Sequence, residues 1–240
     1  MISGRTTLIA HLGYPTESFT APMIYNPWFE RKGIDAVVVP MGVGADDYPA
    51  FLRLLFRLSN IHGALVTMPH KVTTAALLDE VSLAVKIAGS CNAILRRDDG
   101  SLYGDMFDGE GFTRGARRRG FDFAGADCLV VGAGGVGSAI AAAIAAQRPR
   151  SLAICDTRRD AVESLVLRLR RYYPDLAVEI RNKYWLKPRL LDLLRQRAEF
   201  GGGTPQQRLL IRGFALLKRR WAVPSRDLKV SKCPETGSWR

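Results

Sequence analysis

The sequence predicts an α/β protein made of two parts with largely parallel strands, the second of which is incomplete. Three observations predict this fold class: apolar runs of strand length alternate with segments of helical spacing, a glycine-rich turn joins one such run to an alanine-rich segment, and the composition changes near residue 180. The chain of 240 residues is long enough for two ordinary domains. We expect these parts to span residues 1–108 and 109–180, followed by a basic tail at 181–240.

The first part alternates strands with helices. Strands are expected where β-branched and other apolar residues form short runs, and helices where apolar residues recur at helical spacing. The expected strands are 7–12, 36–41 and 63–67, and the expected helices are 22–32, 48–59 and 72–78. Gly33 is expected to end the first helix. This alternation predicts a sheet with parallel pairing.

A turn and a linking helix lead from the first part to the second. The turn 98–100 lies between two short apolar runs, as in a β-hairpin. Residues 109–120 form the expected linking helix, and we interpret its arginines as a solvated face rather than a nucleic-acid patch. The second part is expected to contain strand 127–131, turn 132–137, helix 138–147, strand 151–156 and helix 160–173.

The turn at 132–137 has the spacing of a dinucleotide-binding loop. Its G-x-G-x-x-G pattern follows a predicted strand and opens a predicted helix, which is the context that this motif requires. Gly132 permits a tight turn, Gly134 lets the backbone approach a pyrophosphate, and Gly137 lets helix and strand pack closely. We therefore predict a Rossmann-like nucleotide-binding domain. The predicted loop contacts to the cofactor are Gly132, Gly134, Gly135, Val136 and Gly137.

Asp156 and Arg158 bear on which dinucleotide is bound. Asp156 stands 19 positions after Gly137, where a carboxylate would accept a hydrogen bond from a ribose 2′-hydroxyl and repel a 2′-phosphate. Arg158 would instead pair with such a phosphate. We place both residues at the cofactor site and expect NAD to be favoured over NADP.

Lys71 and Asp108 are the predicted catalytic pair. Lys71 follows an apolar run, and Asp108 lies in a glycine-rich segment between that lysine and the nucleotide turn. A lysine and an aspartate together can hold a substrate hydroxyl while hydride leaves for a nicotinamide. This order of motifs predicts an oxidoreductase. Of the three histidines, His70 is expected to line the site, whereas His11 and His62 are expected to be packed or solvated.

The composition argues against several other classes of protein. The net charge of +12 is concentrated at the end of the chain, because residues 181–240 contain 15 Lys/Arg and 4 Asp/Glu. Four scattered cysteines and three histidines give no zinc-site spacing, and no basic-then-apolar leader opens the chain. We expect a cytoplasmic protein with no metal site and no membrane span. The sequence carries no signal for an oligomeric state.

Four motifs together resemble those of the shikimate/quinate dehydrogenase family over about residues 8–180. Val66–Lys71 is similar to the family's V-T-x-P-H-K, Gly89–Asn92 to its G-A-V-N, Gly104–Gly109 to its G-x-N-T-D-G, and Gly132–Gly137 to its nucleotide turn. The resemblance implies a two-domain fold with the site in the cleft and a role in aromatic amino acid biosynthesis. It also implies a hydroxy or keto acid as the substrate. The residue roles that it implies are Lys71 and Asp108 as catalytic groups and Thr67 and Asn92 as substrate contacts.

The substrate end of the pattern departs from this family. Two serines that hold the substrate carboxylate in the family align with Phe19 and Ala21, and a phenyl ring cannot take over a hydrogen-bonding role. Ser18 or Thr20 could substitute with a shifted backbone. The segment before Asp108 is also more apolar than the family's. We therefore predict weak or absent turnover of shikimate itself, and a different cyclic or small hydroxy or keto acid as substrate.

The tail leaves two functional hypotheses open. Residues 181–240 lack the family's later motifs, which suggests a changed reading frame or a disordered segment. The first hypothesis is an NAD(P)-dependent dehydrogenase of the shikimate dehydrogenase type. The alternative is an inactive relative that binds nucleotide at most, with a basic tail that could contact nucleic acid. Nucleic-acid binding is not expected, because the tail has apolar runs unlike a basic arm.

Overall fold

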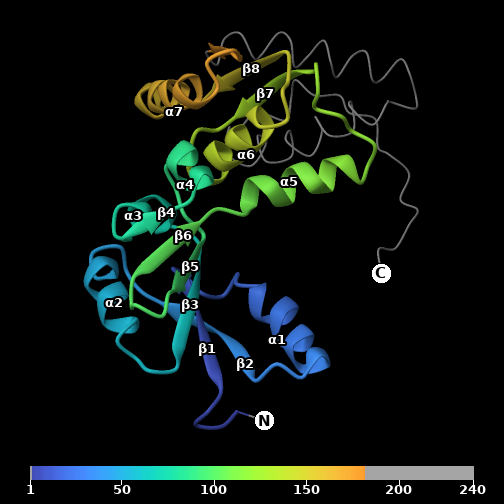
Figure 1. Cartoon of the computed structure of the whole chain (residues 1–240). Helices are drawn as coiled ribbons and strands as arrows, with labels where there is room; N and C mark the ends of the chain where they lie inside the picture. Colours follow the sequence, from blue (N-terminus) through green and yellow to red (C-terminus); the bar gives the residue numbers. More distant parts are fainter. Residues whose placement is uncertain (1, 182–240) are drawn as a thin grey trace, which may run out of the picture.

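The computed structural model describes residues 2–181, and these form two sheets with helices packed against them (Figure 1). The first sheet and its helices occupy the lower half of the view, and the second sheet lies above them. The elements in chain order are β1 Thr7–Gly13, α1 Ala21–Lys32, β2 Ala36–Gly42, α2 Tyr48–Leu55, β3 Ile61–Val66, α3 Lys71–Ala75, β4 Glu80–Val81, α4 Leu83–Ala88, β5 Ala93–Arg96, β6 Leu102–Asp105, α5 Asp108–Arg117, β7 Asp127–Val131, α6 Gly135–Ala145, β8 Ser151–Cys155, α7 Arg159–Tyr172 and β9 Ala177–Ile180.

The first sheet has six strands in the order β2-β1-β3-β5-β6-β4. Its first three strands run parallel, with His11 of β1 between Pro40 of β2 and Leu65 of β3. The expected parallel pairing is correct for these strands, and the hairpin expected around 98–100 is present as β5 and β6, although β5 also pairs antiparallel with β3. The reversal follows from the short turn at 98–100, which can only join antiparallel neighbours.

The second sheet contains three parallel strands in the order β7-β8-β9. Helices α6 and α7 connect these strands, as in the first half of a doubly wound nucleotide-binding fold. The predicted fold class, α/β with a Rossmann-like unit, is confirmed. The expectations for the tail fall on residues 182–240, which lie outside the described residues.

Each sheet has its own core of buried side chains. The first core includes Leu12, Tyr48 and Leu52, which are almost fully buried. The second contains Leu152 and Leu165 among others. Full burial of such a side chain is worth about 1.5–3 kcal/mol, so each sheet carries a substantial stabilising core.

Helix α4 joins the two halves. It packs against α6 and α7, and the guanidinium of Arg168 in α7 donates hydrogen bonds to the carbonyl oxygens of Ile87 (2.7 Å) and Ala88 (3.2 Å). These two carbonyls belong to the last turn of α4, where helix carbonyls have no partner within the helix. These hydrogen bonds hold α7, which packs on the second sheet, against the end of α4, the helix that directly precedes the segment with Asn92.

Several boundaries differ from the expected ones. The helix expected at 48–59 ends at Leu55, and the one expected at 72–78 spans Lys71–Ala75. The elements β4, α4 and β9 were not expected, because they are only two, six and four residues long. Short elements give too few periodic positions for a pattern to be recognised.

Candidate active site

Lys71 stands at the start of α3, directly after the turn that follows β3. The amide of His70 donates to the Thr67 carbonyl (3.0 Å), which closes this turn, and the Lys71 carbonyl accepts a hydrogen bond from the amide of Cys91 (2.8 Å). The backbone of Lys71 is therefore tied to the segment that carries Asn92. Because the end of β3 and the start of β5 are neighbours in the sheet, Lys71 and Asn92 are brought close.

The side chains of Lys71, Asp108 and Asn92 form one polar group. The Lys71 ammonium makes an ion pair with Oδ2 of Asp108, and Asn92 donates from Nδ2 to Oδ1 of the same carboxylate (2.7 Å). The amide of Phe107 in turn donates to Oδ1 of Asn92 (3.0 Å). The lysine and aspartate side chains keep 13% and 25% of their surface exposed, so the pair is shielded yet reachable. This arrangement can bind and polarise a hydroxyl or carbonyl oxygen.

Tyr48 and His70, the residue directly before Lys71, form a buried aromatic pair. The ring of His70 stacks on Tyr48 with centroids 3.9 Å apart, and its Nε2 lies 2.9 Å from the Val43 carbonyl oxygen. The Tyr48 hydroxyl is 2.6 Å from that of Thr74, which donates to the His70 carbonyl (2.9 Å). Burial raises the pKa of Tyr48 to about 12 and lowers the pKa of His70. The His70 ring is thus packed in the core against Tyr48, rather than lining the site.

The glycine turn connects β7 to α6, which begins within the motif at Gly135. Gly132 has a φ of 110°, and a Cβ on Gly137 would overlap the carbonyl group of Gly132, so both positions require glycine. At Gly134 the space is open except for a guanidinium nitrogen of Arg158 3.8 Å from the position of a Cβ. The backbone of this turn is partly exposed, and a helix start of this kind can accept an anionic group. Val136 is exposed beside it.

Ser90 links the glycine turn to the lysine segment, and sequence reasoning did not single it out. Its hydroxyl, which is fully buried, donates to the carbonyl of Gly135 (2.9 Å). A Cβ on Gly135 would lie 3.4 Å from Cβ of Lys71. The start of α6 therefore lies against Lys71. The one sequence signal was a hydroxyl residue two positions before Asn92, where the family motif has alanine.

Asp156 uses both carboxylate oxygens within its own loop. Oδ2 accepts a hydrogen bond from the amide of Ala133 (2.6 Å), and Oδ1 accepts from the amide of Arg158 (3.0 Å) and the hydroxyl of Thr157 (3.1 Å). Burial acts to raise the pKa of Asp156, but these hydrogen bonds outweigh it and lower the pKa. The carboxylate thus holds the glycine turn against the end of β8, while Thr157 and Arg158 are exposed.

The two residues expected to replace the family's serines lie on the surface. Ser18 and Thr20 are exposed in the loop before α1, and within residues 2–181 no hydrogen bond joins either of them to Lys71, Asp108 or Asn92. Phe19 between them is half-buried, and Cζ of its ring lies 2.7 Å from the position that a Cβ on Gly13 would take. The methyl of Thr67 lies against the same point. The structure therefore brings Phe19, rather than its neighbours, to Thr67.

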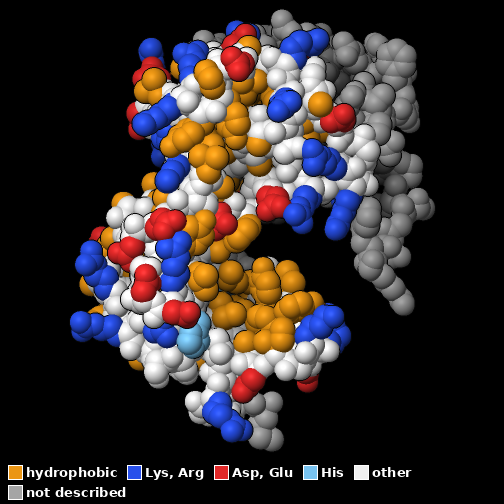
Figure 2. Space-filling model, viewed as in Figure 1, with side chains coloured by type: hydrophobic (Ala, Val, Ile, Leu, Met, Phe, Trp, Pro, Cys, Tyr) orange, Lys and Arg blue, Asp and Glu red, His pale blue; other side chains and the backbone are white. Residues whose placement is uncertain are grey.

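These groups surround a hollow between the two halves of the molecule (Figure 2). Hydrophobic side chains line its lower side over α1, and acidic and basic side chains lie along its upper side at α5. None of the helices within residues 2–181 has the length and apolar character needed to cross a membrane.

Comparisons with known proteins show which family this chain resembles. The family model described as the shikimate dehydrogenase substrate binding domain matches residues 12–94. The shikimate dehydrogenase (NADP(+)) of Rubrobacter xylanophilus is 37% identical over 143 residues, which cover 60% of this chain and 50% of the relative. The described residues resemble the shikimate dehydrogenase family.

Two further proteins extend the shikimate dehydrogenase likeness. The shikimate dehydrogenase (NADP(+)) of Salinibacter ruber is 36% identical over 184 residues, covering 75% of this chain and 63% of the relative. A solved shikimate 5-dehydrogenase of Listeria monocytogenes, in complex with shikimate and NAD, is 26% identical with a TM-score of 0.70, covering 75% of this chain and 63% of that one. The matched part of the chain thus spans between half and two thirds of these relatives.

The expected preference for NAD over NADP is wrong. The curated shikimate dehydrogenase relatives are named as NADP(+) enzymes, although the solved Listeria structure contains NAD. A physical reason lies in Asp156, whose two oxygens already accept hydrogen bonds from the loop, so the carboxylate is held there and has less capacity left for a ribose hydroxyl. Arg158 is exposed, and its guanidinium lies beside the glycine turn.

Proposed function

We propose that this protein is an NADP-dependent dehydrogenase of the shikimate dehydrogenase type, acting on a cyclic or small hydroxy or keto acid. The observation that carries the proposal is the shielded Lys71–Asp108–Asn92 group, with Lys71 lying directly against the start of α6 in the glycine turn. A proton-transfer pair and a cofactor turn at contact distance suit a reaction that moves a proton and a hydride from adjacent atoms.

The polar group acts on the substrate oxygen. Lys71 donates a hydrogen bond to this oxygen, and Asp108 accepts the hydroxyl hydrogen, so the pair takes up the proton as the carbonyl forms. Asn92 holds the carboxylate in place by its bond to Oδ1 and is itself fixed by the amide of Phe107. We keep Thr67, in the turn that precedes Lys71, as the proposed substrate contact. When bound, NADP⁺ supplies the acceptor for the hydride that leaves the carbon bearing this oxygen.

The glycine turn suits a phosphorylated dinucleotide. Of the described residues other than its chain neighbours, only Arg158 lies within 4 Å of a Cβ position on Gly134, and a helix start such as that of α6 leaves backbone amides without a partner in the helix, which suits a pyrophosphate. Thr157 and Arg158, exposed at the end of β8, would hold the 2′-phosphate through a hydroxyl and a charge-assisted hydrogen bond. Asp156 positions both segments rather than contacting the ribose.

We assign residues 1–108 to the substrate-binding and catalytic domain and residues 109–180 to the first half of the nucleotide-binding domain. The division places Asp108, the first residue of α5, at the junction between them. A catalytic group at this junction lies beside both ligands, which is common for sites formed between two domains.

Turnover is tested with the full chain. NADP⁺ is supplied with a panel of cyclic and small hydroxy acids, and NADPH formation is followed by absorbance. We expect turnover of at least one compound, a kcat/KM with shikimate below about 10⁴ M⁻¹ s⁻¹, and loss of activity in Lys71→Met. Lys86→Met, which changes an exposed lysine of α4, is the matched control.

Calorimetric titration with NADP⁺ separates the alternative function. Binding of NADP⁺ without turnover of any panel compound would favour the inactive relative that binds nucleotide only. The absence of NADP⁺ binding would contradict the dehydrogenase and leave only an inactive relative that does not bind nucleotide. An equal loss of activity in Lys71→Met and Lys86→Met would remove the role given to Lys71.

A further inference from the structure

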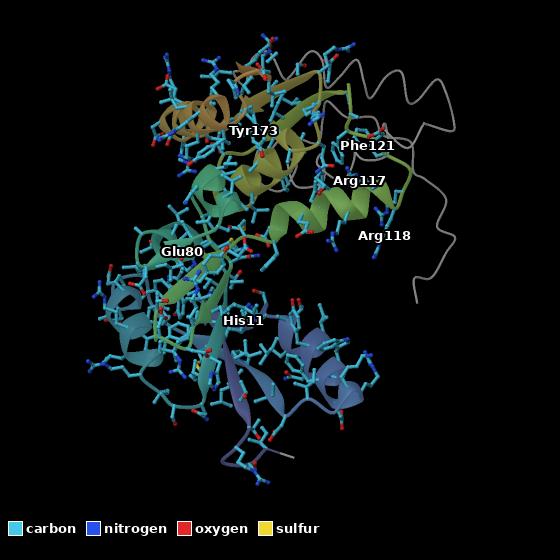
Figure 3. The ribbon with its side chains drawn as sticks, viewed as in Figure 1. His11, Glu80, Arg117, Arg118, Phe121 and Tyr173 are labelled. Atoms are coloured by element: carbon cyan, nitrogen blue, oxygen red, sulfur yellow. The ribbon has the colours of Figure 1, made fainter. Side chains whose placement is uncertain are left out.

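Phe19 and His11 form an aromatic pair next to the predicted substrate contact Thr67. Their ring centroids are 4.2 Å apart. His11 belongs to β1, the strand between β2 and β3, and lies toward the end of that strand which faces α5 (Figure 3). The tip of the Phe19 ring and the methyl of Thr67 meet above Gly13, where even a Cβ would not fit. The pair is therefore part of the wall of the site, not a distant cluster.

This pair of rings offers no positive charge. His11 is 8% exposed, and its Nδ1 is fully covered and has no hydrogen-bond partner within the described residues. Burial, and next the charge of Lys71, lower the pKa of His11, so the imidazole is neutral near pH 7. The charge of Lys71 is itself matched by Asp108. A carboxylate placed against these rings would lose its hydration without gaining a cation.

Uncharged side chains also flank Thr67 and Asp108 in the chain. Met68 and Phe107, which are 70% and 49% exposed, directly follow Thr67 and directly precede Asp108 in the chain. Met106, which directly precedes Phe107 in the chain, is buried. The hydrophobic lining of the hollow in Figure 2 extends the same character over α1. A ligand in this hollow meets charge at Lys71–Asp108 and apolar surface at the end beyond Thr67.

We propose that Phe19 and His11 form a neutral aromatic wall that sets substrate specificity. In this proposal, which rests on the proposed function, the site takes a ring hydroxy or keto compound that presents an uncharged face to the wall. Any carboxylate of the substrate points elsewhere. The hydroxyl or carbonyl that reacts remains at Lys71 and Asp108, and the flat rings pack against the opposite face of the ligand.

The test compares two ligands that share a ring and its hydroxyls and differ in one charge: shikimate and its methyl ester. Their dissociation constants are measured by calorimetry with the full chain saturated with NADP⁺, and their kcat/KM by NADPH formation. We expect the ester to bind at least about 10-fold more tightly than the acid, since desolvating a charge without a partner is the larger penalty.

Three variants locate the effect. Phe19→Ser is expected to lower the preference for the ester by at least about 10-fold, because it admits water and a hydroxyl donor, whereas Phe19→Leu keeps an apolar wall and should retain the preference. Phe121→Ser is the matched control, because this half-buried phenyl lies beyond the end of α5, far from His11 in Figure 3.

The outcomes separate this proposal from the proposed function. Tighter binding of the acid by the unmodified protein, or binding of neither compound, overturns the aromatic wall whether or not turnover is seen. Equal preference in Phe19→Ser and the unmodified protein overturns it as well. If the ester binds preferentially but neither compound nor any panel acid is oxidised, the wall stands and the dehydrogenase function fails.

Discussion

Gly109, the second residue of α5, should tolerate no larger residue without a shift of its helix. A Cβ at this position would overlap the backbone carbonyl group of Ala139 in α6, with the carbonyl carbon only 2.7 Å away, and would lie 2.8 Å from Cβ of Ala143. Ordinary contacts of a Cβ begin at about 3.4 Å. Gly109→Ala therefore forces α5 away from α6 by several tenths of an ångström or more, because a backbone atom cannot rotate aside as a side chain can.

The change in the free energy of unfolding caused by Gly109→Ala follows from two opposing effects. Overpacking of a tight interface costs about 1–3 kcal/mol, and the clash with backbone favours the upper end of this range. Alanine regains about 1 kcal/mol of helix propensity over glycine. We expect Gly109→Ala to lower the free energy of unfolding by about 1–2 kcal/mol. Gly111 in the same helix has no atom within 4 Å of the position of a Cβ, so Gly111→Ala should raise it by up to about 1 kcal/mol.

Urea unfolding of the full chain, followed by circular dichroism, measures this contrast. The two variants make the same chemical change two residues apart in one helix, so propensity cancels in the comparison and packing remains. Because Asp108 adjoins Gly109, a displaced α5 also moves the carboxylate, and activity should fall by up to about 10²-fold in Gly109→Ala only. Equal stability of the two variants would refute the packing argument.

Three further predictions concern the site and its pH dependence. Asp108→Asn should lower kcat/KM by about 10²–10⁴-fold in the NADPH assay without changing the circular dichroism spectrum; a loss below about 3-fold would contradict its role. Arg158→Ala should raise the Kd of NADP⁺ in calorimetry by about 10–100-fold and leave that of NAD⁺ almost unchanged, since it removes one charge-assisted hydrogen bond to the added phosphate; an equal change for both cofactors would speak against it. Burial lowers the pKa of His11 and His70 below the ordinary value of 6.5, so the unfolded chain binds these protons more tightly and the free energy of unfolding should fall as pH drops below that value. Urea midpoints at about pH 7.5 and 5.5 should then differ less in His11→Leu than in the unmodified protein, and an unchanged difference would exclude His11 as a contributor.

Local patterns predicted the long elements and missed three short ones, β4, α4 and β9. The apolar run at 7–12 and the β-branched run at 36–41 correspond to β1 and β2, each of which is seven residues long. Helix α4 has six residues, too few for periodicity, yet its two ends carried a signal. Ser82 caps its first turn by accepting a hydrogen bond from the amide of Val85, and Gly89 ends it with a φ of 67°.

Sequence motifs identified Lys71, Asp108 and Asn92 as site residues, but they could not show that the three side chains are in contact. Lys71 and Asp108 are 37 residues apart, and neither spacing nor composition fixes their distance. They meet because β5 runs antiparallel between β3 and β6, which puts Asn92 next to the ends of both neighbouring strands. The hairpin was predicted, whereas its place beside β3 depends on contacts between residues distant in the sequence.

The error over the cofactor has a physical cause that applies beyond this chain. An acidic residue after the second strand indicates NAD only if its oxygens are free, and a sequence records the residue but not its hydrogen bonds. In this protein the amide of Ala133 in the glycine turn and the amide of Arg158 both donate to Asp156. The carboxylate is therefore a structural link between the two loops that surround the cofactor. Asp156→Ala should then weaken binding of both dinucleotides by loosening the turn, rather than exchange one for the other, and a selective gain for NADP⁺ in calorimetry would show that the carboxylate repels the phosphate after all.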